Sequence, residues 1–406
     1  MLSIEQINTY FPQTAAIYDN GQKITYLDSA ATNLKLQTVI DATIKYYSKE
    51  CANVHRGIHT LSELDTNLYE QTRTLIHELI NTKACEEVIF TSGTTAAINM
   101  VALSWGESNV KKDDEVLISE LEHHSNIIPW QRLCDKVQAN LKVAPINDRG
   151  EIIFEEYQKL LSPKTKLVAI NMISNTLGTI NPIKEMIIEA KKVGAKFLVD
   201  AAQAVSHLKI DVQELDCDFL TISAHKMFGP TGTGALYAKS EILESMPPLF
   251  VGGGMVDKVS FEKSTFIGIP EKFEAGTPNI AGVIAWSPAV EFINQIGLEN
   301  ISQYENELLE YATGKLQSIP GLKIIGTAQE KSAVISFVID GLHPHDIATM
   351  LNKYNIAIRT GHHCTQPIMA KMKINATARA SFALYNTKED VDHLVTSLNK
   401  IIELFS

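Results

Sequence analysis

DCDFLTISAHKMFGPTGTG, residues 216–234, is the stretch that decides the fold. Its apolar run Phe219–Ile222 predicts a buried strand that opens into glycine-rich turns. Ser223, His225 and Lys226 stand where this strand ends. A lysine at such a position can form a Schiff base with a carbonyl cofactor if its pKa is lowered. A solvated loop lysine is the commoner case, so the rest of the chain must decide between the two interpretations.

Length and charge limit the classes of function. The chain has 406 residues and an apolar fraction of 45%, enough for two or three domains with substantial cores. Its 36 basic and 47 acidic residues give a net charge of -11, and no long basic block occurs. This balance argues against a general nucleic-acid or anionic-membrane surface and favours small metabolites or protein partners.

The five cysteines are widely spaced and form no CxxC pair, so neither a disulfide framework nor a zinc ribbon is expected. This pattern fits a reducing cytoplasm. The N-terminal sequence MLSIEQINTYFPQ lacks the basic and apolar regions of a signal peptide, and no later run is long enough to span a membrane. We therefore expect a soluble, untargeted, cytoplasmic protein.

Short apolar runs alternate with helical patterns between residues 88 and 238, which predicts an α/β fold with a mostly parallel sheet between helices. Ligands of such sheets bind outside the carboxyl ends of the strands. By this rule five residues fall at one edge of the sheet: Thr94, His123, Asn175, Asp200 and Lys226.

The segment Thr91–Thr95, TSGTT, follows a short apolar run and precedes a helical pattern. Gly93 allows close backbone approach, the hydroxyls add donors, and a helix N-terminus offers free N–H groups and a positive dipole end. We interpret the segment as an anion cradle. Plain N-capping by serine or threonine is the alternative.

Asp200 ends an apolar run and Gln203 follows three residues later, so both side chains can face one ligand. A buried carboxylate needs a cationic or hydrogen-bonding partner, which a protonated pyridine nitrogen would supply, although helix capping is the commoner role. His123 and His124 are adjacent and point apart on most backbones, so a stacking or proton-handling role suits His123 better than a metal site.

Three regions are expected. Residues 1–20 form an N-terminal segment that packs on the rest of the chain, 21–294 a large domain, and 295–406 a smaller α+β domain that carries the loop AIRTGHHCTQPIM. The glycine- and proline-rich stretch 247–279 predicts a long ordered excursion. His55, in a loop between two helical patterns, either binds a ligand or caps its neighbouring helices.

With these motifs in view, the chain resembles the class V aminotransferase family of fold-type-I pyridoxal-phosphate enzymes, and within it the SufS-type, group II cysteine desulfurases. The resemblance covers nearly the whole length and rests on motifs in the same order and spacing: TSGTT, EHHSN, VDAAQAV, SAHKMFGPTGTG, FEAGTPN, RTGHHC and RASFALYN. It implies a large domain that binds pyridoxal 5'-phosphate and a small domain that carries a catalytic cysteine.

The resemblance also implies a role for each matching residue. Lys226 would hold the cofactor aldehyde, His123 would stack on the ring, and Asp200 and Gln203 would pair with the ring nitrogen and hydroxyl. The phosphate would be bound by Thr94, Thr95, Ser223 and His225, with Thr277 from the neighbouring subunit of a homodimer. The substrate carboxylate would be bound by Asn175 and Arg379, with Arg359 and His55 at the same entrance.

Cys364 separates desulfuration from transamination. In the family's mechanism its thiolate attacks the sulfur of L-cysteine, alanine leaves, and the persulfide passes to an acceptor of the SufE or SufU type for iron-sulfur cluster assembly. An inert loop cysteine is one alternative, and metal binding by His362, His363 and Cys364 is another, although three consecutive residues rarely converge on one ion. No metal is therefore expected.

Three residues depart from the family pattern: Ala96 in place of glutamate, Ser92 in place of arginine, and Thr365 in place of alanine. The first puts in doubt a contact near the dimer interface, and the other two are not expected to touch the core chemistry. Alternative functions are a selenocysteine lyase, another class V enzyme of the aminotransferase or kynureninase type, and a non-catalytic scaffold that has lost the cofactor.

Overall fold

The computed structural model describes residues 4–18 and 21–405. Its central sheet has seven strands among these residues, in the order β2-β8-β7-β6-β5-β3-β4. Their bounds are β2 (Val88–Thr91), β3 (Glu115–Ser119), β4 (Asn140–Ala144), β5 (Thr165–Asn171), β6 (Lys196–Asp200), β7 (Phe219–Ser223) and β8 (Gly234–Ala238). β8 alone runs opposite to the other six strands, so the predicted mostly parallel α/β sheet is confirmed.

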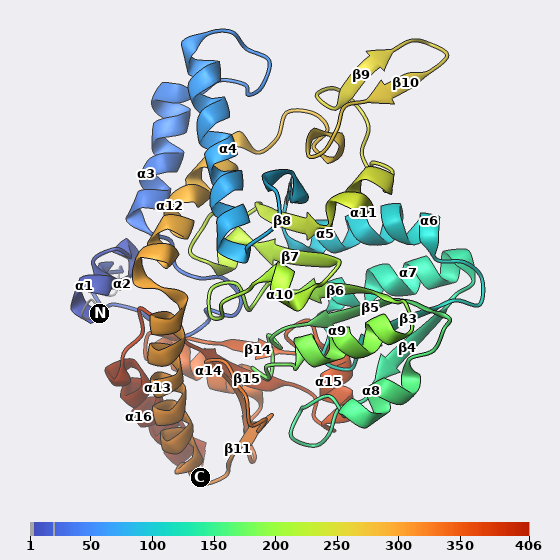
Figure 1. Ribbon diagram of the computed structural model, residues 1–406. Coiled ribbons are helices and arrows are strands. Elements are labelled where there is room, and N and C mark those ends of the chain that lie inside the picture. Colours follow the sequence, from blue (N-terminus) through green and yellow to red (C-terminus); the bar gives the residue numbers. More distant parts are fainter. Residues whose placement is uncertain (1–3, 19–20, 406) are drawn as a thin grey trace.

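Helices cover both faces of this sheet (Figure 1). Strand β5 is therefore buried on both faces. Its residues Val168 and Ile170 belong to one buried hydrophobic cluster, and the alternating residues Leu167 and Ala169 belong to another. The helices of this part are α3 (Gln37–Lys45), α4 (Thr60–Ile80), α5 (Thr94–Met100), α6 (Glu107–Asn109), α7 (Ile128–Val137), α8 (Phe154–Leu160), α9 (Ile183–Lys192), α10 (Val212–Leu215), α11 (Ser240–Ser245) and α12 (Ile280–Ile296). Among the described residues, no helix combines the length and apolar character needed to cross a membrane.

A second, antiparallel sheet has the order β11-β12-β15-β14 and its own buried core. Its strands are β11 (Leu322–Ile325), β12 (Val334–Ile339), β14 (Arg359–Gly361) and β15 (Thr377–Ser381), with α13 (Leu298–Gln317), α14 (Pro344–Lys353), α15 (Gln366–Lys371) and α16 (Lys388–Phe405). β1 (Thr25–Tyr26) pairs with β13 (Ile356–Ala357) across the boundary expected at residue 294. This boundary and the one at residue 20 stay predictions.

The N-terminal segment forms α1 (Ile4–Asn8) and α2 (Pro12–Ala15), while its residues 1–3 and 19–20 lie outside the described residues. Phe11, which lies in the chain between α1 and α2, is fully buried. Its ring makes edge contacts with Phe228, Phe292 and Tyr385, with ring centroids 5.0 to 5.8 Å apart. This phenylalanine therefore joins the segment to the chain beside the Lys226 turn.

The stretch 247–279 contains a hairpin that was not predicted from the sequence. Its strands β9 (Val256–Val259) and β10 (Ser264–Phe266) project away from the body of the molecule (Figure 1). The signal in the sequence is weak, because only three or four residues alternate on each side of the turn.

Candidate active site

One cavity of about 480 Å³ lies at the carboxyl ends of the central strands. Its lining joins residues from the first hundred positions to residues of the second sheet. Twelve of the predicted site residues line it: Thr94, Thr95, His123, Asn175, Asp200, Gln203, Ser223, His225, Lys226, Arg359, Cys364 and Arg379. The five residues that the strand-end rule placed at one edge of the sheet therefore do line one cavity, and their roles stay predictions.

Lys226 ends a short 3-10 turn, Ala224–Lys226, that follows β7 directly. Its carbonyl accepts hydrogen bonds from Asn33 Nδ2 (2.6 Å) and Ser206 Oγ (2.8 Å), which fix the backbone behind the side chain. Burial lowers the pKa of Lys226 from 10.5 to about 8, against the opposing effect of the Asp200 carboxylate. A large share of this amine is therefore neutral, and nucleophilic, near pH 8.

Asp200 ends β6 and is 6% exposed. Its Oδ1 accepts from the Ala202 N–H (3.0 Å), so the capping contact is made while the residue also lines the cavity. Burial raises the pKa of Asp200. Gln203 donates to the Ala30 carbonyl (2.7 Å) and lines the same wall. A cation in the cavity would stabilise this buried carboxylate.

The TSGTT segment and Ser223 bring several hydroxyls together in the cavity lining at the start of α5. The Thr94 N–H donates to Ser223 Oγ (2.9 Å), and Ser223 Oγ lies 3.0 Å from Thr94 Oγ1. Thr95 Oγ1 lies 2.6 Å from Ser125 Oγ. Gly93 has φ 137°, and a Cβ there would come within 3.3 Å of Ser223 Oγ. These donors fit a phosphate group.

His123 and His225 are neutral near pH 7. Burial, assisted by the positive charge of Lys226, lowers the pKa of each to about 4. His123 Nδ1 accepts from the Ser125 N–H (3.1 Å), so the ring proton must lie on Nε2. A neutral imidazole in the cavity wall suits stacking on a flat ring better than ion pairing.

Two arginines share one carboxylate beside the cavity. Asp28 Oδ1 lies 3.0 Å from Arg379 Nη2, and Asp28 Oδ2 lies 3.0 Å from Arg359 Nη2. Arg379 is almost fully buried, and its Nη1 donates to the Asn175 carbonyl (2.9 Å). Its Nε has no hydrogen-bond partner among the described residues. Arg379 therefore lines the cavity as a buried guanidinium, a group suited to binding a carboxylate ligand.

Cys364 is exposed and lines the cavity on a tight turn of the second sheet. It and His363 have left-handed φ values of 58° and 51°. The Cys364 carbonyl accepts from the His124 N–H (2.8 Å), and the His363 carbonyl accepts from Asn175 Nδ2 (2.8 Å). The backbone of the turn is therefore bound to the large sheet's loops while the thiol stays accessible.

His363 is unsuited to act as a base for the thiol. Its Nε2 lies 2.8 Å from Thr377 Oγ1, and burial lowers its pKa to about 3. Among the described residues, no group of three or more His, Cys, Asp or Glu side chains could hold a metal ion.

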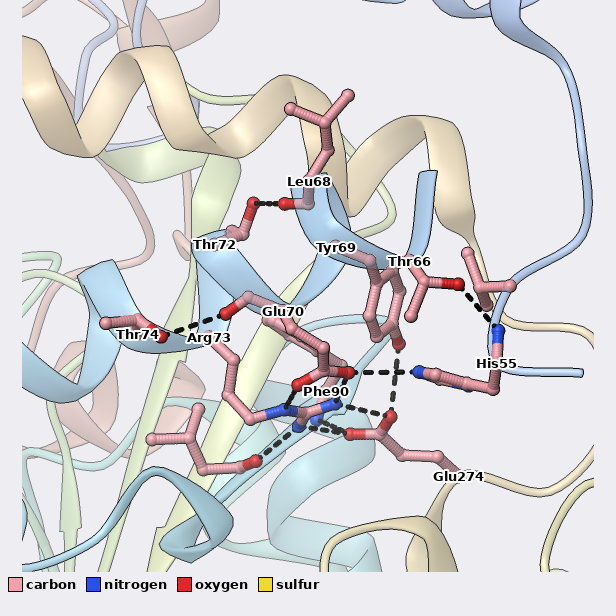
Figure 2. Close-up of polar contacts among 12 residues, drawn as sticks. His55, Thr66, Leu68, Tyr69, Glu70, Thr72, Arg73, Thr74, Phe90 and Glu274 are labelled. Carbon is pink, nitrogen blue, oxygen red and sulfur yellow. Dashed lines mark hydrogen bonds and ion pairs between the residues drawn. The ribbon is translucent and has the colours of Figure 1, made fainter. Parts of the chain in front are cut away.

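Two predicted site residues lie outside this cavity. Thr277 is exposed on the surface, and its predicted service to a neighbouring subunit stays a prediction. His55 does not line the cavity of its own chain, where its Nε2 pairs with Glu70 Oε1 (3.0 Å) on α4, and its predicted place at the entrance stays a prediction. Figure 2 shows His55 at the end of a network that continues through Glu70 and Arg73 to Glu274.

The residues that support the site from behind were not predicted from the sequence. Asp28, which joins the two arginines, was assigned no role. Asn33 and Ser206, which bind the Lys226 carbonyl, and Ser125, beside Thr95, were assigned no role. For Asp28 and Asn33 the available signal was the segment 28–33, DSAATN, in which four of six residues are polar and which follows the expected strand ITYL directly.

An α/β sheet whose strand ends present a buried lysine, a buried aspartate and an anion cradle defines the class of fold-type-I pyridoxal-phosphate enzymes. The family model for aminotransferase class-V matches residues 25–394, so the chain belongs to that family. Pyridoxal 5'-phosphate is the cofactor of this enzyme class.

Relatives within the family are similar over almost the whole chain. A cysteine desulfurase of Synechococcus elongatus is 48% identical over 94% of this chain, which spans 61% of that protein's length. A probable cysteine desulfurase of Halalkalibacterium halodurans is 49% identical over 95% of both proteins. The crystal structure of the cysteine desulfurase CsdA of Escherichia coli superimposes with a TM-score of 0.93, 36% identity and coverage of 100% of this chain and 99% of that one.

Proposed function

We propose that this chain is a cysteine desulfurase, which converts L-cysteine to L-alanine and retains the sulfur as a persulfide on Cys364. The observation that carries the proposal is the shared cavity: the buried amine of Lys226 and the exposed thiol of Cys364 line the same 480 Å³ space. A transaminase would need the lysine but no cysteine at this position. The names of the relatives support the same activity.

The residues present fit pyridoxal 5'-phosphate. Lys226 would hold it covalently, Asp200 would pair with its ring nitrogen, and the neutral His123 would stack on its ring. Gln203 would bind the ring hydroxyl, and the phosphate would be held by Thr94, Thr95, Ser223 and His225. When bound, the cofactor supplies an electron sink for the substrate α-carbon.

The substrate carboxylate would bind at Arg379, whose Nε is free of partners among the described residues. Asn175 and Arg359 stand beside it in the cavity lining. Asp28 offsets one of the two guanidinium charges before the substrate arrives, and its ion pair keeps Arg379 oriented although it is buried.

Lys226 and Cys364 divide the chemistry between them. The Lys226 amine, with a pKa of about 8, can take the proton from the substrate α-carbon. The Cys364 thiolate attacks the substrate sulfur, so that an S–S bond forms as the C–S bond breaks. The electron pair of that bond stays with the carbon, which takes up a proton and leaves as alanine.

The persulfide must then leave the protein. Cys364 is exposed on a short turn, which suits direct attack by an acceptor protein of the SufE or SufU type that serves iron-sulfur cluster assembly. In the homodimer that we propose, each subunit contributes its exposed Thr277 to the other's phosphate site. A reducing compartment such as the cytoplasm suits the reaction, because Cys364 must remain a free thiol.

Replacing Cys364 tests this function. We expect Cys364→Ala to lower alanine formation from L-cysteine at least about 100-fold, because the sulfur loses its acceptor, while the visible absorbance of the bound cofactor stays. Cys51→Ala is the matched control, since Cys51 is also an exposed free thiol and lies outside the cavity. Alanine is measured directly in both variants.

Full turnover of L-cysteine by Cys364→Ala would contradict the proposal. Assays with L-selenocysteine distinguish the desulfurase from a selenocysteine lyase, because selenium leaves more easily than sulfur and its release needs no cysteine nucleophile. If the unchanged chain and Cys364→Ala both turn over L-selenocysteine, and neither turns over L-cysteine, the chain would be a selenocysteine lyase instead.

A further inference from the structure

Two buried threonine hydroxyls meet behind Cys364. Thr176 Oγ1 and Thr365 Oγ1 are 2.8 Å apart, and both residues are fully buried. Thr365 Oγ1 also donates to the His362 carbonyl (2.8 Å). A hydroxyl has one proton, so Thr365 must accept from Thr176 when it donates to His362. The direction of the bonds is thus fixed, from Thr176 through Thr365 to the turn that carries Cys364.

Thr365 uses its hydroxyl in an unusual way for its position. It is the N-cap residue of α15, where a threonine ordinarily accepts a hydrogen bond from the first turn of the helix. Its side chain makes no such capping bond. The hydroxyl instead serves Thr176 and His362, so the contact between the two threonines replaces a contact that would stabilise the helix.

Thr176 is a firm anchor for this bond. Its carbonyl accepts from Ser336 Oγ (2.6 Å) on β12, which is buried in the second sheet. The carbonyl of the preceding Asn175 accepts from Arg379 Nη1 (2.9 Å) on β15. The loop that holds Thr176 is therefore joined to two strands of the second sheet.

The turn around Cys364 needs such an anchor. His363 and Cys364 are consecutive non-glycine residues in the left-handed region, which is unfavourable for residues that carry a Cβ. The exposed Cys364 side chain contributes little packing to offset this strain. Hydrogen bonds from the surrounding chain must therefore hold the turn, and the one from the Thr365 hydroxyl closes it together with the Thr365 N–H to the His362 carbonyl (2.8 Å).

We propose that Thr365, through its bond to Thr176, is a positioning residue that fixes the turn of Cys364 so that the thiol faces the cavity shared with Lys226. This role deepens the proposed function and rests on it for the part played by the thiol. It differs from the expectation drawn from the sequence, in which Thr365 does not touch the core chemistry. Neither threonine contacts the substrate-binding Arg379 through its side chain in the bonds described.

The test compares Thr365→Val, which keeps the shape and removes the hydroxyl, with Thr365→Ser, which keeps the hydroxyl. We expect Thr365→Val to lower kcat for L-cysteine about tenfold, as the loss of a buried hydrogen bond implies, with KM changed less than about twofold. KM should hold because the carboxylate-binding residues are untouched. Thr365→Ser should retain kcat within about twofold, because the same bonds remain possible.

A second measurement follows the turn itself and needs no turnover. Cys364 in the cofactor-loaded protein is alkylated with iodoacetamide, and its rate is compared by peptide mass spectrometry with that of the exposed Cys51 in the same molecule. A released turn should raise the ratio of the Cys364 rate to the Cys51 rate about threefold in Thr365→Val, the scale of one hydrogen bond. This ratio remains informative if the proposed desulfurase activity itself is refuted.

The double variant Thr176→Val with Thr365→Val distinguishes a role in positioning the Cys364 turn from a role in stabilising the folded chain. It leaves no buried hydroxyl without its partner at this contact, so its melting temperature should lie closer to the unchanged chain than either single variant. Its kcat should stay low, because the turn is still released. If Thr365→Val does not fold, Thr176→Val removes the same bond from the other side.

Two outcomes would overturn the proposal. The first is a Thr365→Val protein whose kcat and alkylation ratio both stay within about twofold of the unchanged chain, below the effect of a lost hydrogen bond. The second is a kcat that recovers in the double variant together with the melting temperature, which would make the threonine pair structural only.

Discussion

Lys226 and Cys364 face one cavity from two very different settings. Lys226 follows β7, a strand buried along its whole length within the seven-stranded sheet. Cys364 stands on an exposed turn between a three-residue edge strand and a six-residue helix of the second sheet. The difference follows the role proposed for each group. The Lys226 amine, which must stay fixed, is held by the rigid sheet, and the Cys364 thiol, which must transfer sulfur to an acceptor, lies on the surface.

The two settings also control their residues by different means. Burial changes the chemistry of Lys226, since it lowers the pKa of the amine to about 8. Neutral hydrogen bonds to the backbone control the geometry of Cys364, from the His124 N–H, the Asn175 amide and the Thr365 hydroxyl. Changes near Lys226 should therefore alter every reaction of the enzyme, and changes near Cys364 only the transfer of sulfur.

The largest expected effect is that of Lys226→Ala. It should lower turnover of both L-cysteine and L-selenocysteine at least about a thousandfold, because it removes the amine that binds the cofactor and moves the proton. The visible absorbance of the lysine-linked cofactor should also vanish. Lys226→Arg is the control for charge, since it keeps a cation that cannot form the covalent link.

Assays with both substrates and an absorbance spectrum check this expectation. The contrast between the two settings would be refuted if Lys226→Ala and Cys364→Ala lowered the turnover of both substrates to the same extent. It would also be refuted if Lys226→Ala kept the visible absorbance of the lysine-linked cofactor.

A smaller effect, on stability, is expected on the sheet side from Glu274. Figure 2 shows its carboxylate facing Arg73, which donates through Nη1 (2.8 Å) and Nη2 (3.0 Å). Glu274 also accepts from the Tyr69 hydroxyl (3.1 Å) and the Phe90 N–H (2.7 Å). Glu274→Ala would leave the buried Arg73 guanidinium with only Glu70 as a carboxylate partner, and two buried donors without their acceptor. We expect this to lower the free energy of unfolding by about 3 kcal/mol.

Urea denaturation followed by fluorescence measures this change. The exposed pair of Lys159 and Glu156 is the control, and Glu156→Ala should leave the free energy of unfolding nearly unchanged, because water screens both charges. Thr365→Val on the Cys364 turn should fall between the two, at about 1 kcal/mol for a neutral hydrogen bond. If Glu274→Ala is as stable as Glu156→Ala, ion pairs do not stabilise the side of the large sheet. The contrast with the Cys364 turn, which neutral hydrogen bonds hold, would then be lost.

The sequence predicted the sheet because its strands are apolar on both faces and alternate with helices. It predicted Asp200 because this residue ends such a strand, and Lys226 because it stands one short turn beyond another. It could not predict the contacts that join distant segments. Arg73 and Glu274 are 201 positions apart, and Thr176 and Thr365 are 189 positions apart. Periodicity reports which face of an element is buried, whereas the pairing of distant polar groups depends on how the elements pack.

His55 illustrates the same limit. The resemblance implies a place for it at the cavity entrance, whereas within this chain the Glu70 carboxylate on α4 binds its imidazole and it does not line the cavity. Such a competition between a nearby partner and a distant site is not visible in a sequence pattern, because both partners are ordinary polar residues.

The last expectation, and the smallest, concerns the pH dependence of cofactor loading. Only the neutral form of an amine attacks an aldehyde, so raising the pH through the pKa of Lys226 should increase the loading rate. With a pKa of about 8, the rate should rise about tenfold per pH unit below pH 8 and level off above it. An ordinary lysine, with a pKa near 10.5, would still be rising at about pH 10. His123 and His225, with pKa values of about 4, should already be neutral throughout this range.

Cofactor-free protein mixed with pyridoxal 5'-phosphate between about pH 6 and 10 provides the measurement, through the rate at which visible absorbance appears. Asp200→Asn tests the cause, because the Asp200 carboxylate raises the pKa of Lys226 and its removal should move the midpoint to lower pH. A midpoint near about pH 10 in the unchanged chain would mean that burial does not tune the lysine. The sheet side and the Cys364 turn would then both act through geometry alone, and the contrast between them would reduce to exposure.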